Sequence, residues 1–177
     1  MKWVILAVIV VALLVTTALV IGSRMSRDHV ATVRARYAAS PARVWEKISD
    51  PAQAASWRSD LKRVEMLPPH DGRIAWRETS GNGEITYEMV AQKPMESQVS
   101  RIIDETLPYG GQWEYRLTPD GSGTELTITE RGFVKPALFR FLSRTVFSLT
   151  STMEAYHRSL AGTLNEPSRI MSSTVEH

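Results

Sequence analysis

The chain of 177 residues contains no cysteine, which excludes disulfides, thiolate catalysis, cysteine-ligated zinc and a lipoprotein anchor. It also lacks a strong charge of either sign, because its formal net charge is only +2. Nucleic-acid binding usually requires a strongly basic face, so we predict no nucleic-acid partner. Hydrophobic residues make up 43% and charged residues 23% of the chain, the balance of a globular protein that can bury a core.

Motifs of several well-known catalytic sites are missing as well. The sequence has no G-x-S-x-G elbow of a serine hydrolase and no P-loop. Its histidines (His29, His70, His157 and His177) show no H-E-x-x-H pattern and no close pairing. His70 is expected in a turn, and His157 on the half-exposed side of a helix. We therefore predict neither a metal site nor a cofactor.

One long apolar run stands near the N-terminus. Trp3 to Gly22 is 20 residues without a charge, about 30 Å of helix, which is enough to cross a bilayer. A cleaved signal peptide is the competing interpretation, since Lys2 precedes the run. The apolar stretch of a signal peptide is usually about 7–15 residues long. This run is longer, and no A-x-A cleavage site follows it. We predict a transmembrane anchor over residues 1–24.

The charges around this run bear on its orientation. Lys2 lies on one side, while Arg24, Arg27, Arg34 and Arg36 follow on the other. The positive-inside rule then favours a cytoplasmic domain, although the last two arginines read better as a solvated strand face. The opposite topology stays open.

The next segment changes its periodicity twice. Residues 29–40 alternate between apolar and polar side chains, which predicts a half-buried strand. Ser40 and Pro41 then form a typical helix start, and Asp50-Pro51 begins a second short helix. From Leu61 the period returns to two over six segments joined by short connectors rich in glycine or proline. None of these connectors could house a crossover helix, so we predict an antiparallel meander.

The C-terminal third predicts one long amphipathic helix from Pro136 to about Leu164. The residues that form its apolar stripe are Leu138, Leu142, Val146, Leu149, Met153, Tyr156, Leu160 and Leu164. An antiparallel sheet must bury its apolar face, and this helix is the only large apolar partner. The predicted fold is therefore α+β. A seven-stranded antiparallel sheet curls around the long C-terminal helix, two short helices follow strand 1, and Trp45 and Trp57 pack the open end. The domain spans residues 25–166, and residues 167–177 are a disordered tail.

This order of elements resembles the SRPBCC superfamily, also called START-like or helix-grip, and in particular its polyketide cyclase/dehydrase-like bacterial branch. The resemblance is carried by "ASPARVWEKISDPAQAASW", by the hairpin "GGQWEYRLTPDGSGTELTITERG" and by "YHRSLAGTL" in the closing helix. It covers roughly residues 29–164 and is specific for fold rather than for chemistry. It implies a hydrophobic pocket between the long helix and the concave sheet. For an anchored bacterial member, it also implies the inner membrane.

Strand alternation predicts which side chains face that pocket. The predicted ligand-binding residues are Trp57, Trp76, Glu78, Tyr87, Met89, Trp113, Tyr115, Glu130, Leu149, Met153 and Tyr156. Aromatic residues at such positions are equally compatible with a plain core. Glu78 and Glu130 are the candidates for a catalytic carboxyl, because an inward carboxylate is costly unless it is paired. The tyrosine hydroxyls, Arg101 or a ligand could pair with them, or their position late in each strand could let them reach water.

The segment "ALFRFLSRTVF" carries Phe139, Phe141 and Phe147 between arginines. Such a composition suits an interfacial segment that touches the membrane, or a cover over the pocket mouth, and both interpretations stay open. The basic residues of this region (Lys135, Arg140, Arg144 and Arg158) are expected along the solvated edge of the helix.

We predict that the protein binds a hydrophobic small molecule or lipid while tethered to a membrane through residues 3–22. Two alternatives remain. The first is a cyclase/dehydrase-like enzyme that uses Glu78, Glu130 or Tyr115 as acid or base. The second is a protein-interaction module whose cavity is filled by its own side chains.

Overall fold

One antiparallel sheet organises the computed structural model, which describes residues 1–81, 83–145 and 148–176 and shows eight strands within them. The strands are β1 (Asp28–Tyr37), β2 (Leu61–His70), β3 (Arg73–Ser80), β4 (Gly83–Lys93), β5 (Ser97–Ile102), β6 (Tyr109–Asp120), β7 (Gly123–Val134) and β8 (Arg169–Glu176). Their order in the sheet is β2-β3-β4-β5-β6-β7-β1-β8. Strands β2 to β7 form the predicted meander, because each pairs antiparallel with the next.

Two short helices follow β1, as the sequence predicts. Helix α2 (Pro41–Ile48) begins with proline after Ser40, and the 3₁₀ helix η1 (Pro51–Ser56) is capped by Asp50, whose carboxylate accepts a hydrogen bond from the Ala52 amide at 2.9 Å. Trp45 and Trp57 pack against the main core cluster. The insert between β1 and β2 therefore closes one end of the sheet, which confirms its predicted role.

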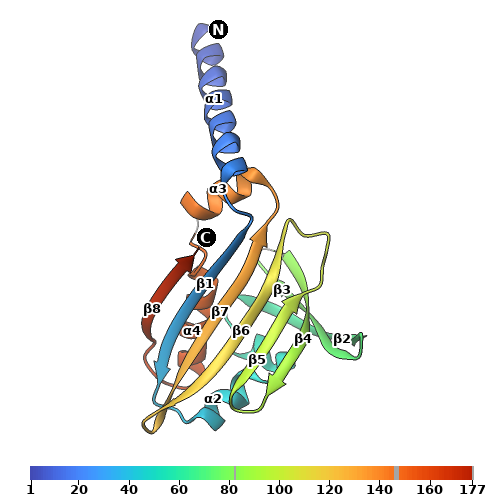
Figure 1. Cartoon of the computed structure of the whole chain (residues 1–177), viewed down its shortest axis with the longest axis vertical. Coiled ribbons are helices and arrows are strands. Elements are labelled where there is room, and N and C mark those ends of the chain that lie inside the picture. Colours follow the sequence, from blue (N-terminus) through green and yellow to red (C-terminus); the bar gives the residue numbers. More distant parts are fainter. Residues whose placement is uncertain (82, 146–147, 177) are drawn as a thin grey trace.

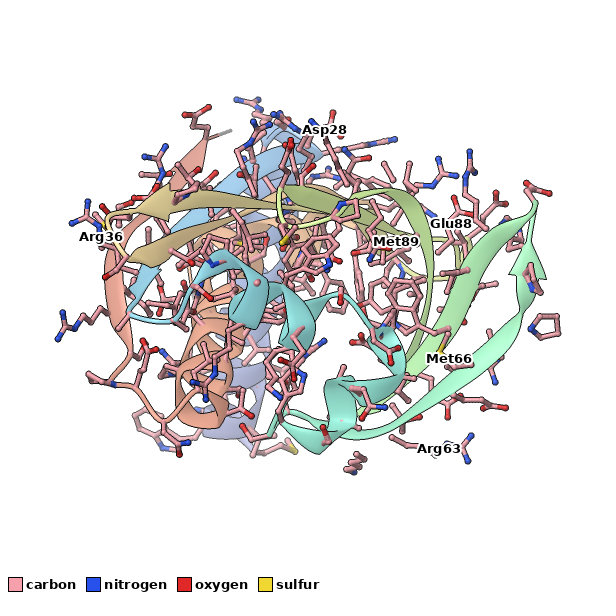
Figure 2. The ribbon with its side chains drawn as sticks, turned by 90° about the horizontal axis from the view of Figure 1, so that it is seen from below. Asp28, Arg36, Arg63, Met66, Glu88 and Met89 are labelled. Carbon is pink, nitrogen blue, oxygen red and sulfur yellow. The ribbon has the colours of Figure 1, made fainter. Side chains whose placement is uncertain are left out.

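The sheet bends around helix α4 (Ser151–Thr163), and α2 and η1 lie at the end seen in Figure 2. The core combines the inward residues of β1, β6 and β7 with one side of α4. Its fully buried side chains include Val33, Leu126, Ile128, Met153 and Leu160. This is the helix-grip arrangement of an α+β domain, so the predicted fold class is confirmed.

The predicted long C-terminal helix is wrong in one respect, because it is divided into two. Helix α3 (Ala137–Thr145) is separate from α4, and Val146 and Phe147 lie outside the described residues. Thr150 forms the N-cap of α4, and its hydroxyl donates to Glu154 Oε1 at 2.9 Å. Ser148 and Ser151 also bond locally. Serine and threonine hydroxyls that satisfy nearby backbone groups favour a helix start over helix continuation, which a hydrophobic stripe alone does not reveal.

The prediction of a disordered tail is wrong for Arg169–Glu176, which form β8 and pair antiparallel with β1. Two interactions bring the chain to this edge. The Glu166 carboxylate accepts hydrogen bonds from the amides of Ala38 and Ala39 at 2.6 and 2.8 Å, and Ile170 packs against the core. Strand β8 covers a strand edge of β1 that would otherwise be open, which raises the strand number from the predicted seven to eight.

Helix α1 (Lys2–Arg24) extends away from the domain, and α3 lies at its foot (Figure 1). An 18-residue stretch of this helix has a mean hydropathy of 3.2, and its side chains are largely exposed, so the helix is long and apolar enough to cross a membrane. Only its C-terminal part contacts the domain, where Ala18 and Gly22 are buried.

Candidate ligand pocket

A pocket of about 670 Å³ lies between the concave sheet, the start of α4 and α3. Its size falls in the range of small-molecule sites, about 300–1,000 Å³. The apolar and aromatic side chains in its wall are Leu61, Ile85, Tyr87, Ile102, Tyr109, Trp113, Phe133, Val134, Phe139, Leu149 and Ala155. Among its polar side chains, hydrogen bonds join two groups, one around Arg58 and one around Glu130.

The first polar cluster joins the end of η1 to β3. Arg58 Nη1 donates to both carboxylate oxygens of Glu78, at 3.1 and 3.0 Å, and Nε and Nη2 donate to Asp60 at 3.2 and 2.6 Å. Trp76 Nε1 adds a hydrogen bond to Glu78 at 3.1 Å. Burial lowers the pKa of Arg58, but the charges of Glu78 and Asp60 more than offset this effect and hold it above its ordinary value. Arg58 is therefore a permanent cation between two carboxylates.

Aromatic rings surround this cluster. The guanidinium of Arg58 lies 5.3 Å from the ring centre of Tyr156, which contacts Trp57 edge-on at 5.0 Å. Tyr115 and Trp113 pack on the same ring, at 5.5 and 6.2 Å. Burial raises the pKa values of Tyr115 and Tyr156 well above the ordinary value for a phenol. Their hydroxyls therefore remain protonated and serve as neutral hydrogen-bonding groups at any physiological pH.

The second polar cluster lies on β7. Glu130 Oε2 accepts a hydrogen bond from Trp113 Nε1 at 2.9 Å, and Glu130 Oε1 lies 3.2 Å from Nε2 of the buried His29. Gly132 makes room for this group, since a Cβ there would lie 2.8 Å from His29 Nε2 and 2.9 Å from Glu130 Oε1. His29 and Glu130 both line the pocket, so the pair presents a carboxylate and an imidazole to its interior.

A small void of about 30 Å³ adjoins the Arg58 cluster. Six of the predicted ligand-binding residues line it, namely Trp57, Trp76, Glu78, Met89, Tyr115 and Tyr156. Within the described ranges, Trp57 Nε1 is the one buried side-chain nitrogen or oxygen without a hydrogen-bond partner. The void has room for a water molecule that could accept this hydrogen bond.

The structure brings most of the predicted ligand-binding residues to these two spaces. Tyr87, Trp113, Glu130 and Leu149 line the pocket, and Glu78 lines both the pocket and the void. Met153 lies elsewhere, because it points from α4 into the fully buried core. Whether any of these residues binds a ligand stays a prediction.

Of the two environments left open for the carboxylates, the structure shows pairing inside the protein. Glu78 and Glu130 do not escape to water at strand ends, because their side chains are only 11% and 23% exposed and each has its own protein partners. Arg58, the main partner of Glu78, carried no signal in the sequence beyond its position after Trp57. Arg101, the partner expected from sequence, instead contacts Glu88 on the opposite face of β4, together with His70 and Arg73.

Three further side chains lie elsewhere than the sequence predicts. His157 is fully buried, and the Tyr37 hydroxyl donates to its Nδ1 at 2.8 Å while its Nε2 donates to the Val33 carbonyl at 3.3 Å. His70 belongs to β2 rather than to a turn. Arg140 is also buried instead of solvated, and its Nε donates to the carbonyl of Gly22 at 2.8 Å.

The comparison with known families agrees with this geometry. The family model described as "Polyketide cyclase / dehydrase and lipid transport" matches residues 28–165, which is most of the chain. The chain belongs to this family. The match begins at β1 and ends before β8, so α1 and the last strand of the sheet lie outside it. No curated protein matches the chain in sequence.

Several solved structures share the fold. The aromatase/cyclase Zhui from a Streptomyces species is 19% identical with a TM-score of 0.62, covering 77% of this chain and 93% of that one. Norcoclaurine synthase from Thalictrum flavum is 14% identical with a TM-score of 0.63, covering 84% and 92%. A START superfamily protein from Mycobacterium smegmatis is 18% identical with a TM-score of 0.59, covering 77% and 97%. At these identities the likeness establishes the fold alone.

Proposed function

We propose that the protein binds one hydrophobic small molecule or lipid in the pocket of about 670 Å³ while α1 anchors it in a membrane. The open pocket is the observation that supports this function most directly. A module that had filled its cavity with side chains would leave no such volume, so the protein-interaction alternative loses its main support. The family, whose description includes lipid transport, supports the same class of ligand.

The distribution of polar groups suggests an amphipathic ligand. Apolar or aromatic side chains and polar side chains line the pocket in equal number, which suits a ligand that has both a hydrocarbon body and polar groups. A hydroxyl, carbonyl or amine of the ligand would be placed near Glu130 or near the Arg58 cluster, where donors and acceptors are already fixed. Both carboxylates of the Arg58 cluster are bonded to the arginine, so this cluster suits a neutral polar group better than an anionic headgroup.

An enzyme of the cyclase/dehydrase type is the second candidate function, and one observation favours it. Glu130 and His29 form a contact that faces the pocket, and such a pair can take a proton from a substrate and return it elsewhere. Glu78 is less suited to this role because Arg58 occupies both of its oxygens. For an enzyme, Glu130→Gln would keep the bound molecule but stop its conversion, so the variant would accumulate an unconverted species.

A differential extraction tests the binding function. The full chain is purified in detergent, denatured, and its organic extract is analysed by mass spectrometry beside those of two alanine-to-phenylalanine variants. Ala155→Phe fills the pocket, whereas Ala52→Phe places the same group on the exposed side of η1. Lipids around α1 are common to all three samples. We expect one species in the wild type and in Ala52→Phe that is lost in Ala155→Phe, and identical extracts would contradict the proposal.

A further inference from the structure

Helix α3 occupies a position that links the anchor to the pocket. It begins at Ala137, directly after β7, and lies against the C-terminal part of α1 (Figure 1). A Cβ at Gly22 would lie 2.0 Å from the Ala137 carbonyl oxygen and 3.3 Å from Phe141 Cβ. Gly22 is the one glycine of α1, and its lack of a side chain allows the backbones of the two helices to approach this closely.

Hydrogen bonds hold α3 at this place. Arg140 Nε donates to the Gly22 carbonyl, one of the last carbonyls of α1, at 2.8 Å. This carbonyl also accepts the Met25 amide at 3.3 Å, and a cation at the C-terminal end of a helix is favoured by the helix dipole. Arg144 Nη2 donates to the Ser26 carbonyl at 2.9 Å, in the short link between α1 and β1. These two arginines therefore attach α3 to the segment that leaves the membrane in the proposed function.

The opposite side of α3 belongs to the pocket. Phe139 and Ser143, one helical turn apart, line it together with Tyr109, Phe133 and Val134 from the ends of β6 and β7 nearest α1. Phe139 nevertheless remains 53% exposed, which places it at the rim of the pocket rather than in its interior. The rim that α3 forms is thus on the side of the domain from which α1 departs.

The length of α1 sets the height of this rim. A helix of 23 residues is about 35 Å long, slightly more than the hydrocarbon thickness of about 30 Å. Gly22 then lies at the boundary between the acyl chains and the headgroups. Because α3 contacts Gly22 directly, it lies in the same boundary, where an exposed phenylalanine is more stable than in water.

We propose that the α3 rim of the pocket lies in the headgroup region of the membrane that α1 crosses, so that an apolar ligand passes between bilayer and pocket beside Phe139. This inference rests on the proposed function and names the source of its ligand. The sequence left two interpretations of Phe139 open, a membrane contact and a cover over the pocket mouth. In this arrangement both hold, because α3 forms the rim of the pocket and lies in the membrane.

Single-cysteine variants test this placement, and the absence of native cysteine makes the labelling specific. An environment-sensitive fluorophore is attached to Phe139→Cys or Ser143→Cys in the full chain, reconstituted in vesicles of phosphatidylcholine and phosphatidylglycerol. Ser122→Cys, in the exposed turn between β6 and β7, is the matched control. We expect spin-labelled lipid to quench the probes at 139 and 143 several-fold more than the probe at 122. Aqueous iodide should show the reverse order. Equal exposure of all three probes to iodide, in folded protein, would overturn the inference.

A second variant and the extraction experiment separate the possible failures. Gly22→Leu should push α3 away from α1 and lower lipid quenching at position 143, with Leu19→Ala on the exposed side of α1 as its control. If the wild type retains its extractable ligand while position 139 is in water, the rim inference is wrong and the proposed function stands. If position 139 is in the bilayer but the pocket extract is empty, the proposed binding function and the ligand route both fail.

Discussion

Arg58 and Glu78 form a buried ion pair in which one guanidinium nitrogen bonds both carboxylate oxygens, with the two side chains only 9% and 11% exposed. The pair joins the end of η1 to β3, the second strand from one edge of the sheet, and Asp60 completes it. The pair therefore attaches the insert between β1 and β2 to the wall of the pocket. Its loss should affect both stability and ligand binding.

Arg58→Met should lower the free energy of unfolding by about 3 kcal/mol, because it leaves two carboxylates without their buried cation. The matched control is Arg63→Met, which removes an arginine whose side chain is 65% exposed and pairs with Glu65 at the surface. A surface pair of this kind contributes about 0–1 kcal/mol. Urea denaturation followed by tryptophan fluorescence compares the two variants, and equal midpoints would show that the buried pair is not a stabilising contact.

The burial of His157 leads us to predict a loss of stability in mild acid. Burial lowers its pKa from 6.5 to about 4 in the folded chain, against smaller opposing effects of the Val33 carbonyl and Glu154. The unfolded chain binds the proton first, so the contribution of His157 is complete above pH 6.5 and is lost as the pH falls toward 4. The loss at the acid end is about 3 kcal/mol at 1.36 kcal/mol per pKa unit.

The measurement is the midpoint of urea denaturation for the wild type and for His157→Gln, taken from about pH 7 down to about pH 4. His157→Gln should be less stable at neutral pH, since it disturbs the bond to Tyr37, but should show a flatter pH profile. The same slope in both proteins would mean that another group controls the acid sensitivity.

Gly132→Ala should disturb the His29–Glu130 contact, because the added Cβ would lie under 3 Å from both side chains. We expect a loss of about 1–3 kcal/mol in stability and a lower yield of the extractable ligand. Gly162→Ala is the matched control, since its added methyl group meets no atom within 4 Å. In a helix this change should be neutral or should stabilise by up to about 1 kcal/mol. If both substitutions changed the free energy of unfolding in the same direction, Gly132 would not be needed to make room for the His29–Glu130 contact.

Removal of β8 should open the free edge of β1. A chain that ends at residue 167 loses the pairing of Val30 to Arg36 with β8. Hydrogen exchange measured on peptides from β1 should become faster for the amides that point toward β8, while those that point toward β7 keep their protection. Unchanged exchange across β1 would show that the last strand is not stably paired in solution.

The sequence predicted the elements that depend on local periodicity. Alternation and short connectors located β2 to β7, and the Ser40-Pro41 and Asp50-Pro51 pairs located α2 and η1. The division between α3 and α4 was missed because apolar spacing continues through it, whereas Ser148 and Ser151 make local bonds to the backbone where α4 begins. Strand β8 was missed because its side chains are almost all exposed, so the strand has no apolar pattern to reveal it.

The site was predicted in part. Strand alternation placed Glu78, Tyr87, Trp113 and Glu130 on the inward face, since inward and outward positions follow from the strand period, and all four line the pocket. Other residues of the sheet that line it, such as Ile102, Tyr109 and Phe133, were not predicted.

The partners of the two carboxylates, Arg58 and His29, come from a loop and from the first positions of a distant strand. The burial of His157 and Arg140 has the same origin, because each side chain reaches a backbone carbonyl far away in the sequence.

Native mass spectrometry of the domain gives the most direct test of a ligand-filled pocket. A protease site placed between α1 and β1, at residues 25–27, releases the domain from detergent-solubilised full-length protein without the lipids that surround α1. We predict a released domain that carries one hydrophobic molecule per chain, and an Ala155→Phe domain at its bare mass. Wild-type domain that is folded and bare, or both domains carrying the same adduct, would contradict binding in this pocket.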